Sequence, residues 1–174
     1  MRTVDIITLL TQWDLRGRFL YTTADLSKLL AEKSPHTFNT RLRRLVTAGI
    51  LRRMARGVYL FAQSAHIDGA ILEAIAQTLR RGAYNFVSYE SALSEYGVIS
   101  QVPIDRLTVA TTGRRGEYRT PYGAIEFTHT ERDPASLMSN TLIRDGRLLP
   151  LATQDLALQQ LRRSGRNLDM IGEL

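Results

Sequence analysis

Apolar positions in the first third of the chain recur at helical spacing. From Thr3 to Asp14 they fall three and four residues apart, which predicts an amphipathic helix. Thr22 and Asp25 form the pattern of a capping box and predict the start of a second helix. Ser34 as N-cap and Pro35 at the first helical position predict a third helix. The apolar positions of this third helix are Phe38, Leu42, Leu45 and Val46.

Two short apolar-rich runs follow the third helix and predict a β-hairpin. They are Ile50–Met54 and Val58–Phe61, separated by a turn that carries Arg56 and Gly57. Phe19–Tyr21 predicts a short extended segment between the first two helices. Three short helices followed by a hairpin form a winged helix-turn-helix.

Helical and strand-like patterns are mixed in the rest of the chain. A two-residue turn at Asp145-Gly146 predicts a hairpin between residues 142–143 and 148–149. The other expected elements are helices over about 68–81, 89–96 and 153–163, a short terminal helix near Asn167, and strands over 107–110 and 124–128. We therefore expect an α+β protein, with an N-terminal winged helix-turn-helix followed by a small mixed α+β domain. The predicted divisions are a winged helix-turn-helix over 1–62, a polar linker over 63–68 and an α+β domain over 69–174.

The composition excludes several classes of protein. The chain has no cysteine, which excludes disulfides, thiolate nucleophiles and Cys-ligated metal sites. No run approaches the roughly 18 apolar residues of a membrane span. The first residues lack the apolar segment of a secretory signal, so a cytoplasmic protein with no membrane partner is expected.

The basic residues are concentrated in the first third of the chain. Residues 1–62 contain 11 Lys+Arg and 4 Asp+Glu, a balance of +7, whereas residues 63–174 contain 12 and 13, a balance of −1. All the basic residues except Lys28 and Lys33 are arginines, whose planar guanidinium suits phosphate oxygens and guanine edges. This asymmetry predicts nucleic-acid binding by the first third.

The third predicted helix carries most of the candidate DNA contacts. With its apolar stripe in the core, the opposite face presents hydrogen-bonding side chains. The N-terminal half of this helix is expected near the bases through His36, Thr37 and Thr40. Arg43 and Arg44 are expected to contact phosphate or guanine. The alternative is a polar face that is merely solvated. The candidate DNA-binding residues are Ser34, His36, Thr37, Asn39, Thr40, Arg41, Arg43 and Arg44 in the helix, with Arg52, Arg53 and Arg56 in the wing.

Two further patterns suggest other chemistry. His129, Glu131 and Asp133 alternate, so on a strand they would share one face and could ligate a metal, although a polar strand end is equally expected. The loop at residues 113–116 could bind phosphate but fits no P-loop pattern. The chain has no nucleophile elbow or dinucleotide fingerprint. We expect no catalytic residue, metal or cofactor.

Four stretches resemble a known family, in the family's order. Leu45–Tyr59 is similar to its "Leu…Gly-Ile-Leu-x-Arg…Arg-Gly-Val-Tyr" stretch. Phe86–Leu93, followed by Tyr96–Ile99, is similar to its helix after the wing. Thr120–Phe127 resembles its "Thr-x-Tyr-Gly-x-Ile-x-Phe" strand, and Pro150–Leu158 its late "Ala-x-x-x-x-Ala-Leu" helix. The family is that of the AbiEi antitoxins, and the resemblance covers nearly the whole chain.

The resemblance implies an antitoxin of a type IV toxin–antitoxin system linked to abortive phage infection. The winged helix would bind a double-stranded DNA operator and repress its own operon. The second domain would counteract a cognate nucleotidyltransferase toxin, without the need for a stable complex. The alternative is a winged-helix transcriptional regulator whose second domain binds an effector or a dimer partner.

Overall fold

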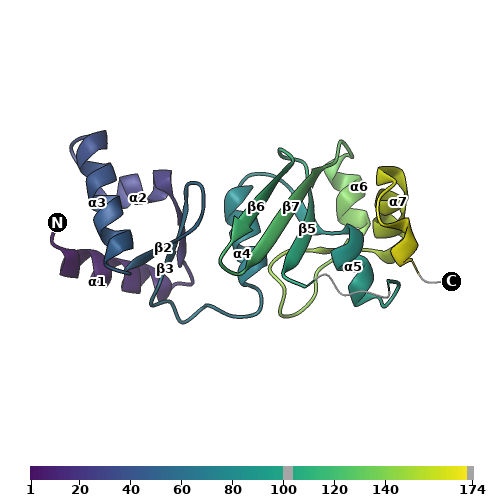
Figure 1. The fold of residues 1–174 in the computed structure, drawn as a ribbon, viewed down its shortest axis with the longest axis horizontal. Coiled ribbons are helices and arrows are strands. Elements are labelled where there is room, and N and C mark those ends of the chain that lie inside the picture. The colour runs from purple at the N-terminus through teal and green to yellow at the C-terminus, as the bar shows by residue number, and fades with distance from the viewer. Residues whose placement is uncertain (100–103, 172–174) are drawn as a thin grey trace. The chain divides into compact units, whose positions relative to one another are not determined.

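The computed structural model describes residues 1–99 and 104–171 and divides the chain into two compact units. The first unit is Met1–Gly69 and the second is Ala70–Leu174. Residues 100–103 and 172–174 of the predicted second domain lie outside the described part. The fold is α+β, with an N-terminal winged helix-turn-helix followed by a small mixed α+β domain (Figure 1). Among the described residues, no helix has the length and apolar character needed to cross a bilayer.

The first unit has the helices and strands predicted for it. Ser34 Oγ accepts a hydrogen bond from the Thr37 amide at 3.1 Å, and Thr22 with Asp25 completes a capping box, so both predicted helix starts are confirmed. The elements are α1 (Thr3–Asp14), β1 (Leu20–Thr22), α2 (Thr23–Leu30), α3 (Pro35–Thr47), β2 (Leu51–Ala55) and β3 (Val58–Phe61).

The wing is a three-stranded antiparallel sheet in the order β1-β3-β2. Its two-residue turn places Gly57 at φ +77°, a conformation that strongly favours glycine. The Gly57 carbonyl accepts a hydrogen bond from the Thr23 amide at 2.9 Å. The tip of the wing is therefore attached to the start of α2.

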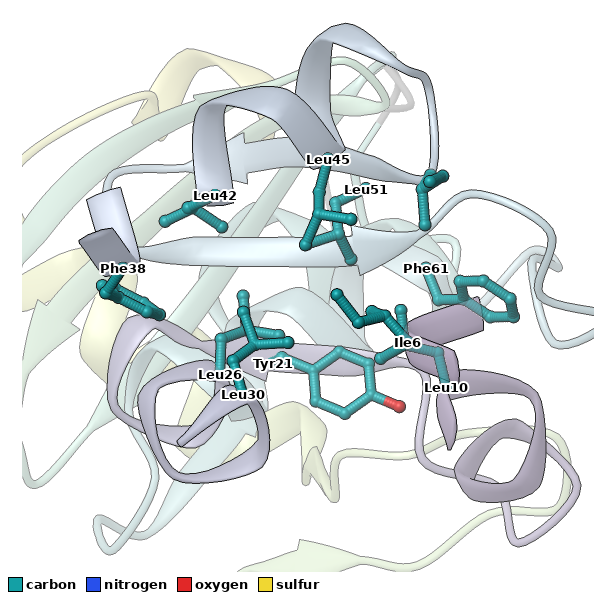
Figure 2. Close-up of a cluster of buried hydrophobic side chains, with 11 residues drawn as sticks. Ile6, Leu10, Tyr21, Leu26, Leu30, Phe38, Leu42, Leu45, Leu51 and Phe61 are labelled. Carbon is teal, nitrogen blue, oxygen red and sulfur yellow. The ribbon is translucent and has the colours of Figure 1, made fainter. Parts of the chain in front are cut away.

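The core of the first unit lies between α3, the other two helices and the wing sheet. Phe38, Leu42 and Leu45 form the buried stripe of α3, as predicted, whereas the fourth predicted position, Val46, is only partly buried against the cluster. Figure 2 shows these side chains gathered with those of α1, α2 and the wing. The other members of the cluster are Ile6, Leu10, Tyr21, Leu26, Leu30, Ile50, Leu51 and Phe61. This packing fixes how α3 is rotated about its own axis.

The segment predicted as a linker, residues 63–68, is bonded to the end of α1. The buried carboxylate of Asp14 accepts a hydrogen bond from Ser64 Oγ at 2.5 Å and another from the Ala65 amide at 3.3 Å. The His66 ring donates from Nε2 to the Asp14 carbonyl oxygen at 2.8 Å. These bonds keep the segment within the first unit.

The second unit is built on a mixed six-stranded sheet in the order β6-β7-β5-β4-β9-β8. Within it, β5 pairs parallel with β7 and β4 pairs parallel with β9, and the other pairs are antiparallel. Its strands are β4 (Asn85–Val87), β5 (Arg106–Thr111), β6 (Gly116–Thr120), β7 (Gly123–His129), β8 (Thr141–Leu142) and β9 (Leu151–Ala152). Its helices are α4 (Ile71–Leu79), α5 (Tyr89–Glu95), α6 (Pro134–Ser139), α7 (Gln154–Ser164) and a 3-10 turn at Leu168–Met170.

The predicted hairpin around Asp145-Gly146 is wrong in its second strand. Residues 141–142 pair with Leu151–Ala152, so the connection is longer than a two-residue turn. The amides of Leu148 and Leu149 instead donate to one carboxylate oxygen of Glu73 at 3.0 and 2.9 Å. The buried carboxylate of Glu73 on α4 therefore accepts hydrogen bonds from two backbone amides that would pair with the other strand in a hairpin.

We expect Tyr21 to make the first unit sensitive to alkali. Burial raises the pKa of Tyr21 to about 12 from the ordinary 10, and its hydroxyl donates to the Arg18 carbonyl oxygen at 2.7 Å. Because burial disfavours the phenolate, the stabilisation of the fold by protonated Tyr21 is complete below pH 10. It is lost as the pH rises toward 12. Urea unfolding on either side of pH 10 should show a smaller alkaline loss for Tyr21→Phe than for the parent. An equal loss in both proteins would contradict this assignment.

Candidate nucleic-acid interface

The exposed face of α3 carries most of the residues predicted to contact DNA. The side chains of His36, Thr37, Asn39, Arg43 and Arg44 are exposed, opposite the buried stripe. Thr40 lies on the same face and is half-buried. The hydroxyl of Ser34 is used as the helix cap, so its contribution to this face is to fix the first turn.

A groove of about 420 Å³ separates α3 from the wing. Arg53 on β2 and Tyr59 on β3 are cross-strand partners and form its wing side. Asn39 and Arg43 line its helix side. The remaining lining residues are Leu42, Val46 and Thr47. An amide, two guanidinium groups and a phenol from three elements therefore border one concave surface.

Arg43 borders a second hollow on the other flank of α3. This hollow has a volume of about 380 Å³ and is shared with Arg44 and Thr40. Thr47 and Ala48 complete its lining. Arg43 therefore borders both hollows.

Each of the four acidic residues within 1–62 is already engaged inside the first unit. The ion pairs are Asp5 with Arg2, Asp25 with Arg18 at 2.9 Å and Glu32 with Arg41 at 2.5 Å, while Asp14 accepts from residues 64 and 65. Within the described residues, no ion pair is formed by Arg43, Arg44, Arg53 or Arg56. These four arginines therefore contribute positive potential on α3 and the wing that no direct ion pair neutralises.

The two successive arginines of β2 lie on opposite faces of the wing. Arg53 lines the groove, so Arg52 points away from it, because neighbouring side chains alternate along a strand. Arg56 is exposed at the tip of the wing, next to Gly57. Among the predicted wing contacts, the structure brings only Arg53 into the groove beside α3.

Arg41 differs from the other arginines of α3. Its side chain is 28% exposed and pairs with Glu32, while Nη1 donates to the Met1 carbonyl oxygen at 2.8 Å. These contacts connect α3 to the N-terminus and to the end of α2. The structure gives Arg41 a role in holding the first unit together, which its polar flanking position in the sequence did not reveal.

Tyr59 and Thr47 line the groove but were absent from the predicted contacts. Tyr59 lies two residues before the buried Phe61, so the two side chains share a face of β3. That spacing also suits a core residue, and Tyr59 is in fact half-buried against the cluster. Only its pairing with Arg53 identifies it as part of the groove.

The possible metal-binding trio is not assembled. Strand β7 ends at His129, whose Nδ1 donates to the Gly113 carbonyl oxygen at 2.7 Å. Asp133 caps α6 by accepting from the Ser136 amide at 3.1 Å, and Glu131 lies in the connection between them. In the described part of the chain, no group of three His, Cys, Asp or Glu side chains could hold a metal ion.

Comparison with known proteins supports the fold. No protein-family model and no curated protein matches the sequence. The crystal structure of the RV2827C protein from Mycobacterium tuberculosis is similar to this chain, with a TM-score of 0.56 and 16% identity. The match covers 88% of this chain and 58% of that one, so the chain spans little more than half the length of this neighbour. The resemblance to AbiEi antitoxins stays a prediction.

We predict that neutralising Arg41 lowers stability, whereas neutralising Arg43 weakens DNA binding. Arg41→Gln should lower the free energy of unfolding by roughly 0.5–1 kcal/mol, because it removes a partly exposed ion pair and a hydrogen bond. Arg43→Gln should leave stability within about 0.5 kcal/mol and weaken DNA binding. Chemical denaturation and DNA titration of both variants check the contrast. Equal destabilisation by the two changes would show that Arg43 is not free of the core.

Proposed function

We propose that the protein is a DNA-binding antitoxin and autorepressor of a type IV toxin–antitoxin operon. Its winged helix-turn-helix binds a double-stranded operator, and its second unit counteracts a nucleotidyltransferase toxin. The observation that carries the DNA-binding part is the groove between α3 and the wing, bordered by Arg43 and Arg53, neither of which has an acidic partner among the described residues. The antitoxin part is supported by the four stretches that resemble AbiEi antitoxins.

The geometry of α3 suits docking into the major groove of DNA. In a helix-turn-helix, the N-terminal residues of the second helix contact base edges. Here that turn is exposed and presents His36, Thr37 and Asn39, and an Asn side chain can bond an adenine edge in bidentate fashion. Arg43 lies one turn further along, where a guanidinium can reach phosphate or guanine. We expect bases to be contacted from residues 36–40 and the backbone mainly from the arginines.

The wing supplies the second set of contacts. Its tip is bonded to the start of α2, so Arg56 is presented by a fixed turn. A wing arginine suits either phosphate or a narrow minor groove. Arg53 and Tyr59 face α3 across the groove, where their donors suit the phosphate backbone of a duplex seated on the helix.

Arg56→Ala should weaken binding to operator and unrelated duplexes by a similar factor if its partner is phosphate. The reason is that phosphate contacts fix position without carrying sequence information. Competition titrations at low and moderate salt measure this factor for each duplex. Binding that is unchanged at low salt would show that the tip of the wing does not touch DNA.

A double change on α3 separates an antitoxin from a plain repressor. Arg43→Gln/Arg44→Gln should lower operator affinity by roughly 2 kcal/mol or more, about 30-fold, because two charge-assisted contacts are lost. Repression of a reporter behind the protein's own promoter should fall accordingly. The variant should still protect cells when the cognate nucleotidyltransferase toxin is expressed from an independent promoter.

The matched control is Arg162→Gln/Arg163→Gln, which removes the same charge from exposed positions on α7. It should repress like the parent. Failure of the parent itself to protect against the nucleotidyltransferase would favour an ordinary winged-helix regulator. Joint loss of repression and protection in an α3 variant that melts like the parent would show that protection depends on nucleic-acid binding by the first unit.

A further inference from the structure

A basic hollow in the second unit has no part in the proposed operator contacts. It has a volume of about 860 Å³ and lies at the connection between β5 and β6, beside the end of β7. Arg114 and Arg115 form its charged rim, and both side chains are exposed. Its other lining residues are Thr112, Gly113, Thr128 and His129.

The net charge of −1 over residues 63–174 does not show how the charges of the second unit are distributed. Five glutamates of the second unit form ion pairs with three arginines. The pairs are Glu73 and Glu95 with Arg147, Glu90 with Arg166, Glu117 with Arg106, and Glu126 with Arg106 and Arg166. Among the residues that the structure describes, Arg114 and Arg115 form no ion pair. No direct ion pair therefore neutralises their charge, in spite of the acidic total.

The backbone of the basic loop is held from two sides. The Arg80 side chain, from the end of α4, donates from Nε to the Arg114 carbonyl oxygen at 2.8 Å, and its guanidinium lies 4.3 Å from the Phe127 ring centroid. His129 holds the Gly113 carbonyl from the other side. Both contacts engage main-chain atoms of the loop, so the guanidinium groups at 114 and 115 are left available.

Close packing explains the glycine at the start of this loop. A Cβ at Gly113 would lie 3.2 Å from Ala83 Cβ and 3.3 Å from Arg80 Cδ, closer than ordinary contact. The Gly113 amide also donates to Thr111 Oγ1 at 3.0 Å. A loop ordered in this way presents its donors at a lower entropic cost than a free one.

The lining indicates the class of ligand. Guanidinium and hydroxyl groups are the donors that bind phosphate oxygens of a nucleic-acid backbone. No Phe, Tyr or Trp is among the described lining residues, whereas sites for single strands stack bases on such rings. We propose that Arg114 and Arg115 form a second DNA site, which binds the phosphate backbone of a duplex in addition to the contacts made by the winged helix.

Arg114→Gln/Arg115→Gln in the full chain tests this proposal. Against a mixed-sequence duplex of roughly two helical turns, affinity at about 0.1 M salt should fall about tenfold. The slope of log K against log salt should become shallower by about 1.8, the value for two phosphate contacts. Arg114→Lys/Arg115→Lys keeps both charges and should retain the parental slope. Fluorescence anisotropy over a range of salt concentrations gives both quantities.

Three comparisons make the result decisive. Arg162→Gln/Arg163→Gln removes equal charge elsewhere in the second unit and should leave the slope unchanged. The loss of affinity and of slope caused by the 114/115 change should also be seen in the Arg43→Gln/Arg44→Gln background. The second site is therefore tested whether or not the operator proposal is correct. A slope matching that of the 162/163 control would overturn the second site. A loss as large on single-stranded RNA of the same length would overturn its assignment to a duplex.

Discussion

The buried stripe of α3 is the constraint on which the candidate interface depends. Because an α-helix turns once in 3.6 residues, burying Phe38, Leu42 and Leu45 leaves no choice about which side chains face outward. Asn39 and Arg43 are thereby directed to the groove. The same core contains residues of the wing strands, so helix and wing are held by one packed cluster. The groove between them is a consequence of that packing.

Internal pairing decides where charge is available in both units. In the first unit, the acidic side chains are engaged away from the exposed face of α3, and Arg41 is drawn inward by Glu32. In the second unit, glutamates hold three arginines and leave the loop at 114–115 uncompensated. Net charge therefore describes each unit incompletely. What a polyanion meets is the set of guanidinium groups that remain after the internal pairs have formed.

The sequence predicted most of the first unit, because its signals are local. The helix caps at Thr22 and Ser34 and the turn at Gly57 each involve residues that are only a few positions apart in the chain. The second unit depends more on distant contacts. Strand β6 is an edge strand without a buried residue, so it has no apolar pattern to detect. The predicted second strand of the hairpin is wrong because Glu73, far away in sequence, accepts hydrogen bonds from the amides at 148 and 149.

Binding of DNA in the groove between α3 and the wing can be followed directly through the arginine side chains. The measurement is a titration of the full chain with duplex from its own promoter, followed through the Nε–Hε signals in ¹H–¹⁵N spectra. The signals of Arg43 and Arg53 should shift and broaden as the complex forms, while that of Arg41, held by Glu32, should stay in place. Saturating binding that leaves the Arg43 and Arg53 signals unchanged would show that the duplex does not bind in this groove.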